Sequence, residues 1–267
     1  MSTVGIHRVG DGVLAGLIDQ SPASVSLTDD HRRSLAARFR AVPSTQHRRV
    51  DAWLVEHAGR SASPFAWTPA SARRTLATSA LRRCVGAPGT SLREAVESAI
   101  DDQCVRALSG VSHAGSLARF LGDASSPVRA LCAAEALTWA VTVLEVARGL
   151  ATPWSVAPCD LYYDVAGART SLRARRDVVV ARGDDTILIR LRPGAPGPSA
   201  GPGLRADLCV AALAAPDGRA PARLIGAWPD AGVLLAIDPS MADLRAGARD
   251  LVRAAVVLAR PRALIAA

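Results

Sequence analysis

The sequence predicts an α/β or α+β protein in which a mainly helical first half precedes a mixed central sheet. Three observations lead to this fold class. Helix-start signals recur through residues 1–150, strand-like runs begin after Pro153, and an amphipathic helix is expected near the end. With 49% hydrophobic residues and a mean hydropathy of +0.18, the chain can bury a core and is not expected to be disordered.

Capping signals mark the expected helices of the first half. Thr28 precedes two aspartates, and Thr68 precedes a proline at the first helical position. Ser91 and Glu94 form a capping box, and Ser126 opens the longest expected helix, which runs to about Leu150. Two apolar spacings are expected to face inward on helices: Val50, Trp53 and Leu54 in one segment, and Val96, Ile100 and Val105 in another.

The period of the pattern changes from helical to strand-like after Pro153. Residues 171–180 and 186–191 are expected to form a hairpin, because only the short Arg182-Gly-Asp-Asp segment separates them. A helix is expected over residues 204–215 and a last one over 240–258. The remaining expected strands are Leu161–Val165, Ala222–Trp228 and Val233–Ile237.

The expected organisation is a mainly helical region, residues 1–150, followed by an α/β core, residues 151–267. Two arrangements remain open: the first region forms a separate domain, or it wraps the sheet as part of one integrated unit. We favour the integrated unit.

The basic side chains are all arginine. The chain holds 32 Lys+Arg residues, none of them lysine, against 24 acids, for a net charge of +8. Arginine stays protonated in proteins, so chemistry that needs a lysine nucleophile or Schiff base is excluded. Residues 169–192 hold seven arginines and three aspartates, and this concentration permits attraction to nucleic-acid phosphates.

The cysteines and the chain start predict a cytoplasmic protein. Five cysteines are scattered without a CxxC pair, as is typical of free thiols in a reducing compartment. Charged residues interrupt the apolar positions of the first 22 residues, unlike a signal peptide. No uncharged apolar stretch of about 18 residues occurs, so no membrane partner is expected.

The hairpin carries the candidate functional residues. Strand alternation is expected to place Arg173, Arg175 and Asp177 on one face of the first strand, and Arg190 and Arg192 together on the second. Antiparallel pairing would then bring Asp177 close to these arginines.

This pattern resembles the PD-(D/E)XK nuclease core, in particular recombination-type members found in actinobacteria. The resemblance covers roughly residues 155–260 and includes the helix around residues 206–213 and the later strands. It implies that Asp177 stands at the metal-binding aspartate. Arg190 stands where a second acidic ligand is expected, Arg192 where the catalytic lysine is expected, and Ala174 replaces a glycine. An upstream helical carboxylate of the family would be Glu94 or Glu97.

These replacements predict that catalysis is impaired. The family needs Mg²⁺ held by at least two carboxylates, with a lysine near the attacking water. Three interpretations of Asp177 remain: an ion pair with Arg190 or Arg175, part of a phosphate-binding surface, or part of a metal site. The phosphate-binding surface would consist of Arg173, Arg175, Arg190 and Arg192.

Three functions follow as hypotheses. The first is a nuclease-like fold without nuclease activity that binds DNA or a protein partner and needs no cofactor. The second is an active Mg²⁺-dependent nuclease whose ligands are Asp177, Asp164 and Glu94, with Asp160 as a further substitute. The third is a structural or interaction protein that binds no nucleic acid.

Overall fold

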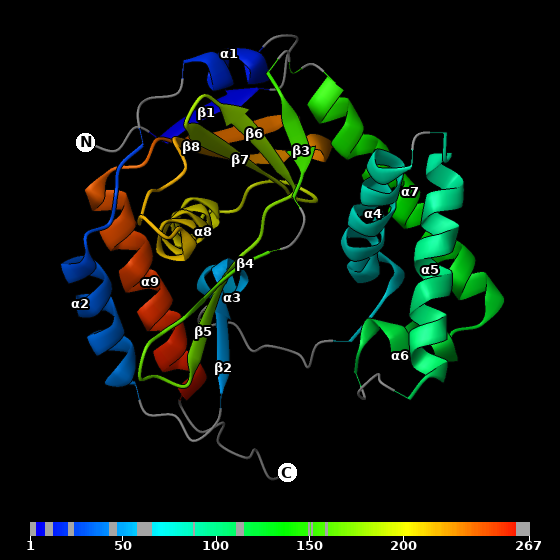
Figure 1. Cartoon of the computed structure of the whole chain (residues 1–267), viewed down its shortest axis with the longest axis horizontal. Coiled ribbons are helices and arrows are strands. Elements are labelled where there is room, and N and C mark those ends of the chain that lie inside the picture. The colour runs from blue at the N-terminus through cyan, green and yellow to red at the C-terminus, as the bar shows by residue number, and fades with distance from the viewer. Residues whose placement is uncertain are drawn as a thin grey trace. The chain divides into compact units, whose positions relative to one another are not determined.

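A computed structural model of the chain describes residues 4–8, 13–20, 24–42, 47–57, 66–87, 89–110, 115–148, 150, 152–157 and 160–259. These residues include nine α-helices and two mixed sheets, of six and three strands, so the predicted α+β class is confirmed. The chain divides into two compact units (Figure 1). Residues 1–61, 149–155 and 159–267 form the sheet unit, and residues 62–148 and 156–158 form the helical unit.

The division therefore does not follow residue 150. Residues before 62 belong to the same unit as the C-terminal strands and helices. Two early strands explain this: β1 (Val4–Arg8) pairs with β9 (Val233–Ile237), and β2 (Arg48–Asp51) pairs with β5 (Thr170–Ala174).

The helical unit is built from α4 (Pro69–Gly86), α5 (Leu92–Leu108), α6 (Leu117–Asp123) and α7 (Ser126–Arg148). Both expected N-terminal caps are present, and Thr68 and Ser91 each form a full capping box. Val96 and Ile100 lie in the core, whereas Val105 is 64% exposed, so its expected inward position is wrong. Nine residues from Val96 is two and a half turns, which places Val105 on the opposite side of α5.

Within the described residues, one helix is long and apolar enough to cross a membrane by length and composition alone. It is α7, between Ser126 and Ala147. This is weak evidence for a membrane, because a core helix passes the same test and α7 packs against α4 and α5. Arg73 of α4 pairs with Glu135 of α7 at 3.3 Å and lies over the ring of Trp139.

The six-stranded sheet of the other unit has the order β1-β9-β8-β7-β6-β3. Neighbours β7 and β8 are parallel and are joined through α8 (Ala200–Ala214), whereas β6–β7, β8–β9 and β1–β9 are antiparallel. The other four strands of this sheet are β3 (Trp154–Val156), β6 (Val178–Arg182), β7 (Asp185–Leu191) and β8 (Arg223–Trp228).

The second sheet has the order β2-β5-β4, with β4 at Leu161–Asp164. Here Val50, expected on a helix, lies on β2, fully buried opposite Leu172. The helix begins two residues later, as α3 (Ala52–His57), and the Asp51 carboxylate accepts a hydrogen bond from the Leu54 N–H at 3.2 Å. The i, i+3, i+4 spacing thus spans a strand end and a helix start.

The hairpin prediction is correct for β6 and β7 and wrong for the length of the first strand. Residues 171–180 are divided between β5, in the small sheet, and β6, in the large sheet. The alternation of inward- and outward-facing side chains along residues 170–182 is compatible with one long strand or with two short ones. The chain crosses between the sheets at residues 175–177, where the N–H of Asp177 already bonds to Ile189 of β7 at 3.1 Å.

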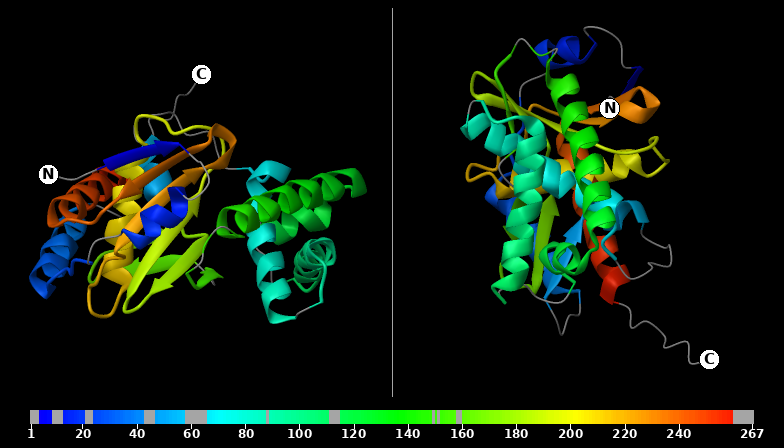
Figure 2. Two further views of the ribbon diagram at one scale, coloured as in Figure 1. Left: turned by 90° about the horizontal axis from the view of Figure 1, so that it is seen from above. Right: turned by 90° about the vertical axis from the view of Figure 1, so that its right-hand side faces the viewer.

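Helix α8 is the centre of the sheet unit. It contacts β4 and β5 of the small sheet and β8 and β9 of the large one, and it packs along α9 (Met241–Ala259) and α3 (Figure 1). Because neighbours surround it, eleven of its fifteen residues are buried, which explains its nearly uniform apolar sequence. Helix α2 (Asp29–Arg40), capped by Thr28 as predicted, lies beside α9 (Figure 2).

The opposite face of the large sheet is covered in part by α1 (Val13–Asp19). Arg223 and Arg182 extend from β8 and β6 and donate hydrogen bonds to carbonyls of this helix, at Leu17 and Ile18. Arg223 also pairs with Asp238, so its charge is compensated where it leaves the sheet.

Candidate functional site

The four candidate arginines meet carboxylates where β7 ends beside α8 and the small sheet. We call this group the arginine–carboxylate network. Its members are Arg173, Arg175, Arg190 and Arg192, with the carboxylates of Asp51, Glu56, Asp160 and Asp207.

The most buried pair of the network joins β7 to α8. Arg190 and Asp207 form an ion pair, and the two residues are 5% and 2% exposed. The second oxygen of Asp207 accepts a hydrogen bond from the backbone N–H of Arg175 at 3.4 Å. Burial lowers the pKa of Arg190 to about 9, with nearby Arg192 the next cause. Arg190 is therefore still protonated at neutral pH, and Asp207 is its counter-ion.

The next pair joins the end of β7 to α3. Arg192 donates two hydrogen bonds to the Glu56 carboxylate, in the bidentate arrangement that suits a guanidinium. Its guanidinium carbon also lies 5.3 Å from the ring centroid of the buried Trp228. Glycine at position 203 leaves room for this carboxylate, since a Cβ there would collide with Glu56.

The remaining two arginines connect the network to the small sheet. Arg173 lies 3.4 Å from the Asp51 carboxylate and 3.5 Å from that of Asp160. Arg175 approaches Asp51 at 4.0 Å. Asp51 thus serves two guanidiniums while its other oxygen caps α3. The four arginines all have partners inside the protein.

Asp177 lies at the start of β6 and is 3% exposed. One of its carboxylate oxygens accepts a hydrogen bond from the Leu191 N–H at 2.9 Å. Its negative charge also raises the pKa of Arg190, against the larger effect of burial. The hydrogen bond ties the start of β6 to the end of β7, and the charge of the carboxylate acts on Arg190.

The residues present do not fit the magnesium site that the resemblance implies. Arg190 and Arg192 bring two positive charges to the hairpin end, where a divalent cation would be repelled. Asp164 accepts a hydrogen bond from Ser171, whose hydroxyl oxygen lies 3.0 Å from His47 Nε2. Among the described residues, no group of three or more His, Cys, Asp or Glu side chains could hold a metal ion.

Glu94, the other proposed ligand, belongs to the helical unit. Its carboxylate accepts hydrogen bonds from the hydroxyl and the backbone N–H of Ser91, and these bonds lower the pKa of Glu94. Its observed role is to cap α5.

Sequence reasoning missed the acidic partners Asp51, Glu56 and Asp207. Asp207 carried a usable signal, because it stands on an apolar helix in step with Leu204 and Ala211. A carboxylate in such a stripe is buried and needs a partner. Glu56 carried no comparable signal, because its arginine is 136 residues away along the chain.

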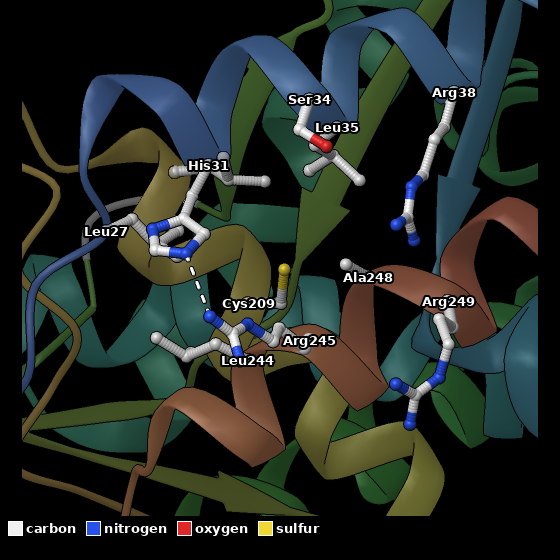
Figure 3. Close-up of a pocket in the computed structure, with 11 residues that line it drawn as sticks. Leu27, His31, Ser34, Leu35, Arg38, Cys209, Leu244, Arg245, Ala248 and Arg249 are labelled. Atoms are coloured by element: carbon white, nitrogen blue, oxygen red, sulfur yellow. Dashed lines mark hydrogen bonds between the residues drawn. The ribbon is translucent and has the colours of Figure 1, made fainter.

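A second candidate site is a pocket of about 190 Å³ between α2, α8 and α9 (Figure 3). We call it the basic pocket. Its polar groups are His31, Ser34, Arg38, Arg245 and Arg249. Its apolar wall consists of Leu27, Leu35, Leu213, Leu244 and Ala248, together with Cys209. Among the described residues no acidic side chain lines it, so its wall carries positive charge without a carboxylate to balance it.

The hydrogen bonds of His31 indicate which of its two ring nitrogens carries the proton in this pocket. Arg245 lies 3.3 Å from His31 Nε2, and Thr28 Oγ1 lies 2.8 Å from His31 Nδ1. Because a guanidinium only donates, Nε2 must accept, so Nδ1 carries the proton and donates to Thr28. The buried thiol of Cys209 is inert, since burial raises its pKa to about 12.

No protein family model matches this chain, and no curated protein or solved structure matches it either.

Proposed function

We propose that this protein is a nuclease-like fold without nuclease catalysis that binds nucleic acid. The order of elements supports the likeness to the PD-(D/E)XK core. An antiparallel hairpin is followed by a helix that crosses to a strand parallel to the second hairpin strand, and a further strand and helix end the unit.

The arginine–carboxylate network is the observation that supports a loss of catalysis. The resemblance implies that Arg190 and Arg192 replace the second acidic ligand and the lysine, and each of them makes an ion pair with a carboxylate from another element. A metal ion there would have to displace these pairs and overcome the repulsion of two cations. That repulsion costs several kcal/mol at an effective dielectric of about 20.

The binding part of the proposal rests on a different set of arginines. Helices α2 and α9 lie side by side and expose four that have no carboxylate within ion-pair distance in the described part of the chain. We call this set the outer arginine face: Arg38, Arg40, Arg245 and Arg249. Guanidiniums that no internal carboxylate neutralises can contact phosphates.

One experiment tests both parts on the purified full chain. Single- and double-stranded DNA are incubated with Mg²⁺ or Mn²⁺, and binding to the same DNA is measured as a function of salt. We expect no cleavage and an affinity that falls steeply with salt. Substitution of all four residues of the outer arginine face by alanine should reduce the slope of log K against log salt. The reduction should be about 0.9 for each phosphate of double-stranded DNA, and about 0.7 for each phosphate of single-stranded DNA, that the variant no longer binds.

The matched control is a variant of the exposed arginines of the helical unit, Arg93→Ala with Arg119→Ala, which should leave the slope unchanged. Cleavage that disappears with Asp177→Ala would establish an active nuclease instead. Absence of DNA binding at low salt would favour the interaction-protein hypothesis.

A further inference from the structure

We propose that the basic pocket binds a small organic oxyanion, a carboxylate or phosphate joined to an apolar body of about the size of a benzene ring. The inference goes beyond nucleic-acid binding, and it rests on the apolar wall of the pocket together with Arg38, Arg245 and Arg249, which belong to the outer arginine face as well. It holds whether or not the chain binds DNA.

The cationic groups of the pocket select an anion. Arg38 extends from α2 toward α9, and Arg245 of α9 reaches back to His31, so guanidiniums from two helices face the same space (Figure 3). In the described part of the chain, neither Arg38 nor Arg249 has a carboxylate within ion-pair distance. The hydrogen bond from Arg245 to His31 Nε2 uses one donor and holds the guanidinium in place, leaving its others for a ligand.

The rest of the pocket selects an apolar body attached to that anion. Leucines from α2, α8 and α9 line the pocket together with Leu27, which precedes α2, and the protonated Cys209 thiol lies among them as a small apolar group. A volume of about 190 Å³ exceeds that of a cavity known to hold benzene, roughly 150 Å³. A bare inorganic ion would leave this apolar wall uncovered.

The same chemistry occurs in free aromatic acids and in a terminal nucleotide, and the probes distinguish these sources. Binding of benzoate, phenyl phosphate, inorganic phosphate and neutral benzyl alcohol to the full chain is measured by calorimetry, beside a short single-stranded oligonucleotide with and without a 5′-phosphate. We expect saturable binding of benzoate and phenyl phosphate, and at least tenfold weaker binding of benzyl alcohol and inorganic phosphate. An oligonucleotide that competes with benzoate only when it carries the 5′-phosphate would identify the nucleotide source.

Variants separate the pocket from the surface around it. Arg38→Ala should weaken benzoate binding at least tenfold, whereas Arg40→Ala, an exposed arginine on the same helix outside the pocket, should not. Ala248→Leu adds apolar volume inside the pocket without changing charge, so it should abolish benzoate binding and leave the salt-dependent binding of long DNA intact. Equal binding of benzoate and benzyl alcohol, equal effects of the two arginine variants, or no saturable binding would overturn the proposal.

Discussion

The function of an arginine in this protein depends on whether a carboxylate stands beside it. Asp207 and Glu56 neutralise the two arginines at the hairpin end, and the network becomes part of the core. Arg38 and Arg249 lack such partners among the described residues and remain available to an external anion. The sequence alone shows 32 arginines but not which of them are compensated, because the partners lie far away along the chain.

The Arg190–Asp207 pair offers a prediction at this scale. Removing one partner of a buried ion pair leaves a charge without compensation, so Asp207→Asn should lower the free energy of unfolding by about 3–5 kcal/mol. Replacing both partners by apolar residues, Arg190→Met with Asp207→Leu, should recover most of that loss. The measurement is urea unfolding, read from hydrogen-exchange protection of β7 and α8 amides.

The control for this prediction is an exposed ion pair of the same unit. Arg33 and Asp30 are 74% and 86% exposed, so Arg33→Gln should change stability by less than about 1 kcal/mol. A double variant no more stable than Asp207→Asn alone would show that the site needs the ion pair itself and not merely charge balance.

At the scale of elements, local signals predicted helix starts well and strand partners poorly. Thr28, Thr68 and Ser91 cap helices as expected, because a cap is decided within four residues. The break between β5 and β6 could not be predicted, since it depends on which sheet each half joins. Strand β2 was not predicted from the sequence, because Val50 pairs with Leu172 of β5, which lies 122 residues later in the chain.

The contact between α8 and α9 offers a prediction about packing. A Cβ at Gly247 of α9 would collide with the carbonyl of Arg205 and lie 3.1 Å from the Cβ of Cys209. Gly247→Ala should therefore lower the free energy of unfolding by about 1–3 kcal/mol through overpacking, although alanine favours a helix by about 1 kcal/mol.

Gly16 of α1 provides the matched control for that substitution. It lies inside a helix of the same unit, and no described atom outside its own stretch of helix comes within 4 Å of the place that a Cβ would take there. Gly16→Ala should therefore raise stability by up to about 1 kcal/mol. Both variants are compared by urea unfolding with the same α8 amides as the probe. A stabilised Gly247→Ala variant would mean that α9 can move away from α8 at little cost.

At the scale of the whole molecule, the two units differ in how their cores are assembled. Among the described residues, the helical core consists of side chains from α4 to α7 and their flanking residues, such as Trp67. The core of the sheet unit combines residues 27–55 with residues 161–259. A continuous stretch of chain therefore contains the helical core, whereas the sheet unit needs two distant stretches.

This difference predicts how fragments of the chain will behave. Residues 62–148 alone should give a helical circular-dichroism spectrum and unfold cooperatively. Residues 151–267 alone should not fold, because they lack β1 and β2 and leave Arg173 and Arg192 without Asp51 and Glu56. Uncompensated charges in a core cost several kcal/mol each, comparable with the total stability of a small domain.

Fragment complementation gives the decisive measurement. Mixing residues 151–267 with a separate peptide of residues 1–61 should restore dispersed amide resonances, because the peptide supplies both strands and both carboxylates. A peptide carrying Asp51→Asn and Glu56→Gln provides the control. It keeps the strands but removes the negative charges, so it should bind more weakly and restore less structure. If residues 151–267 folded without the peptide, the early strands and their carboxylates would be peripheral to the unit rather than part of its core.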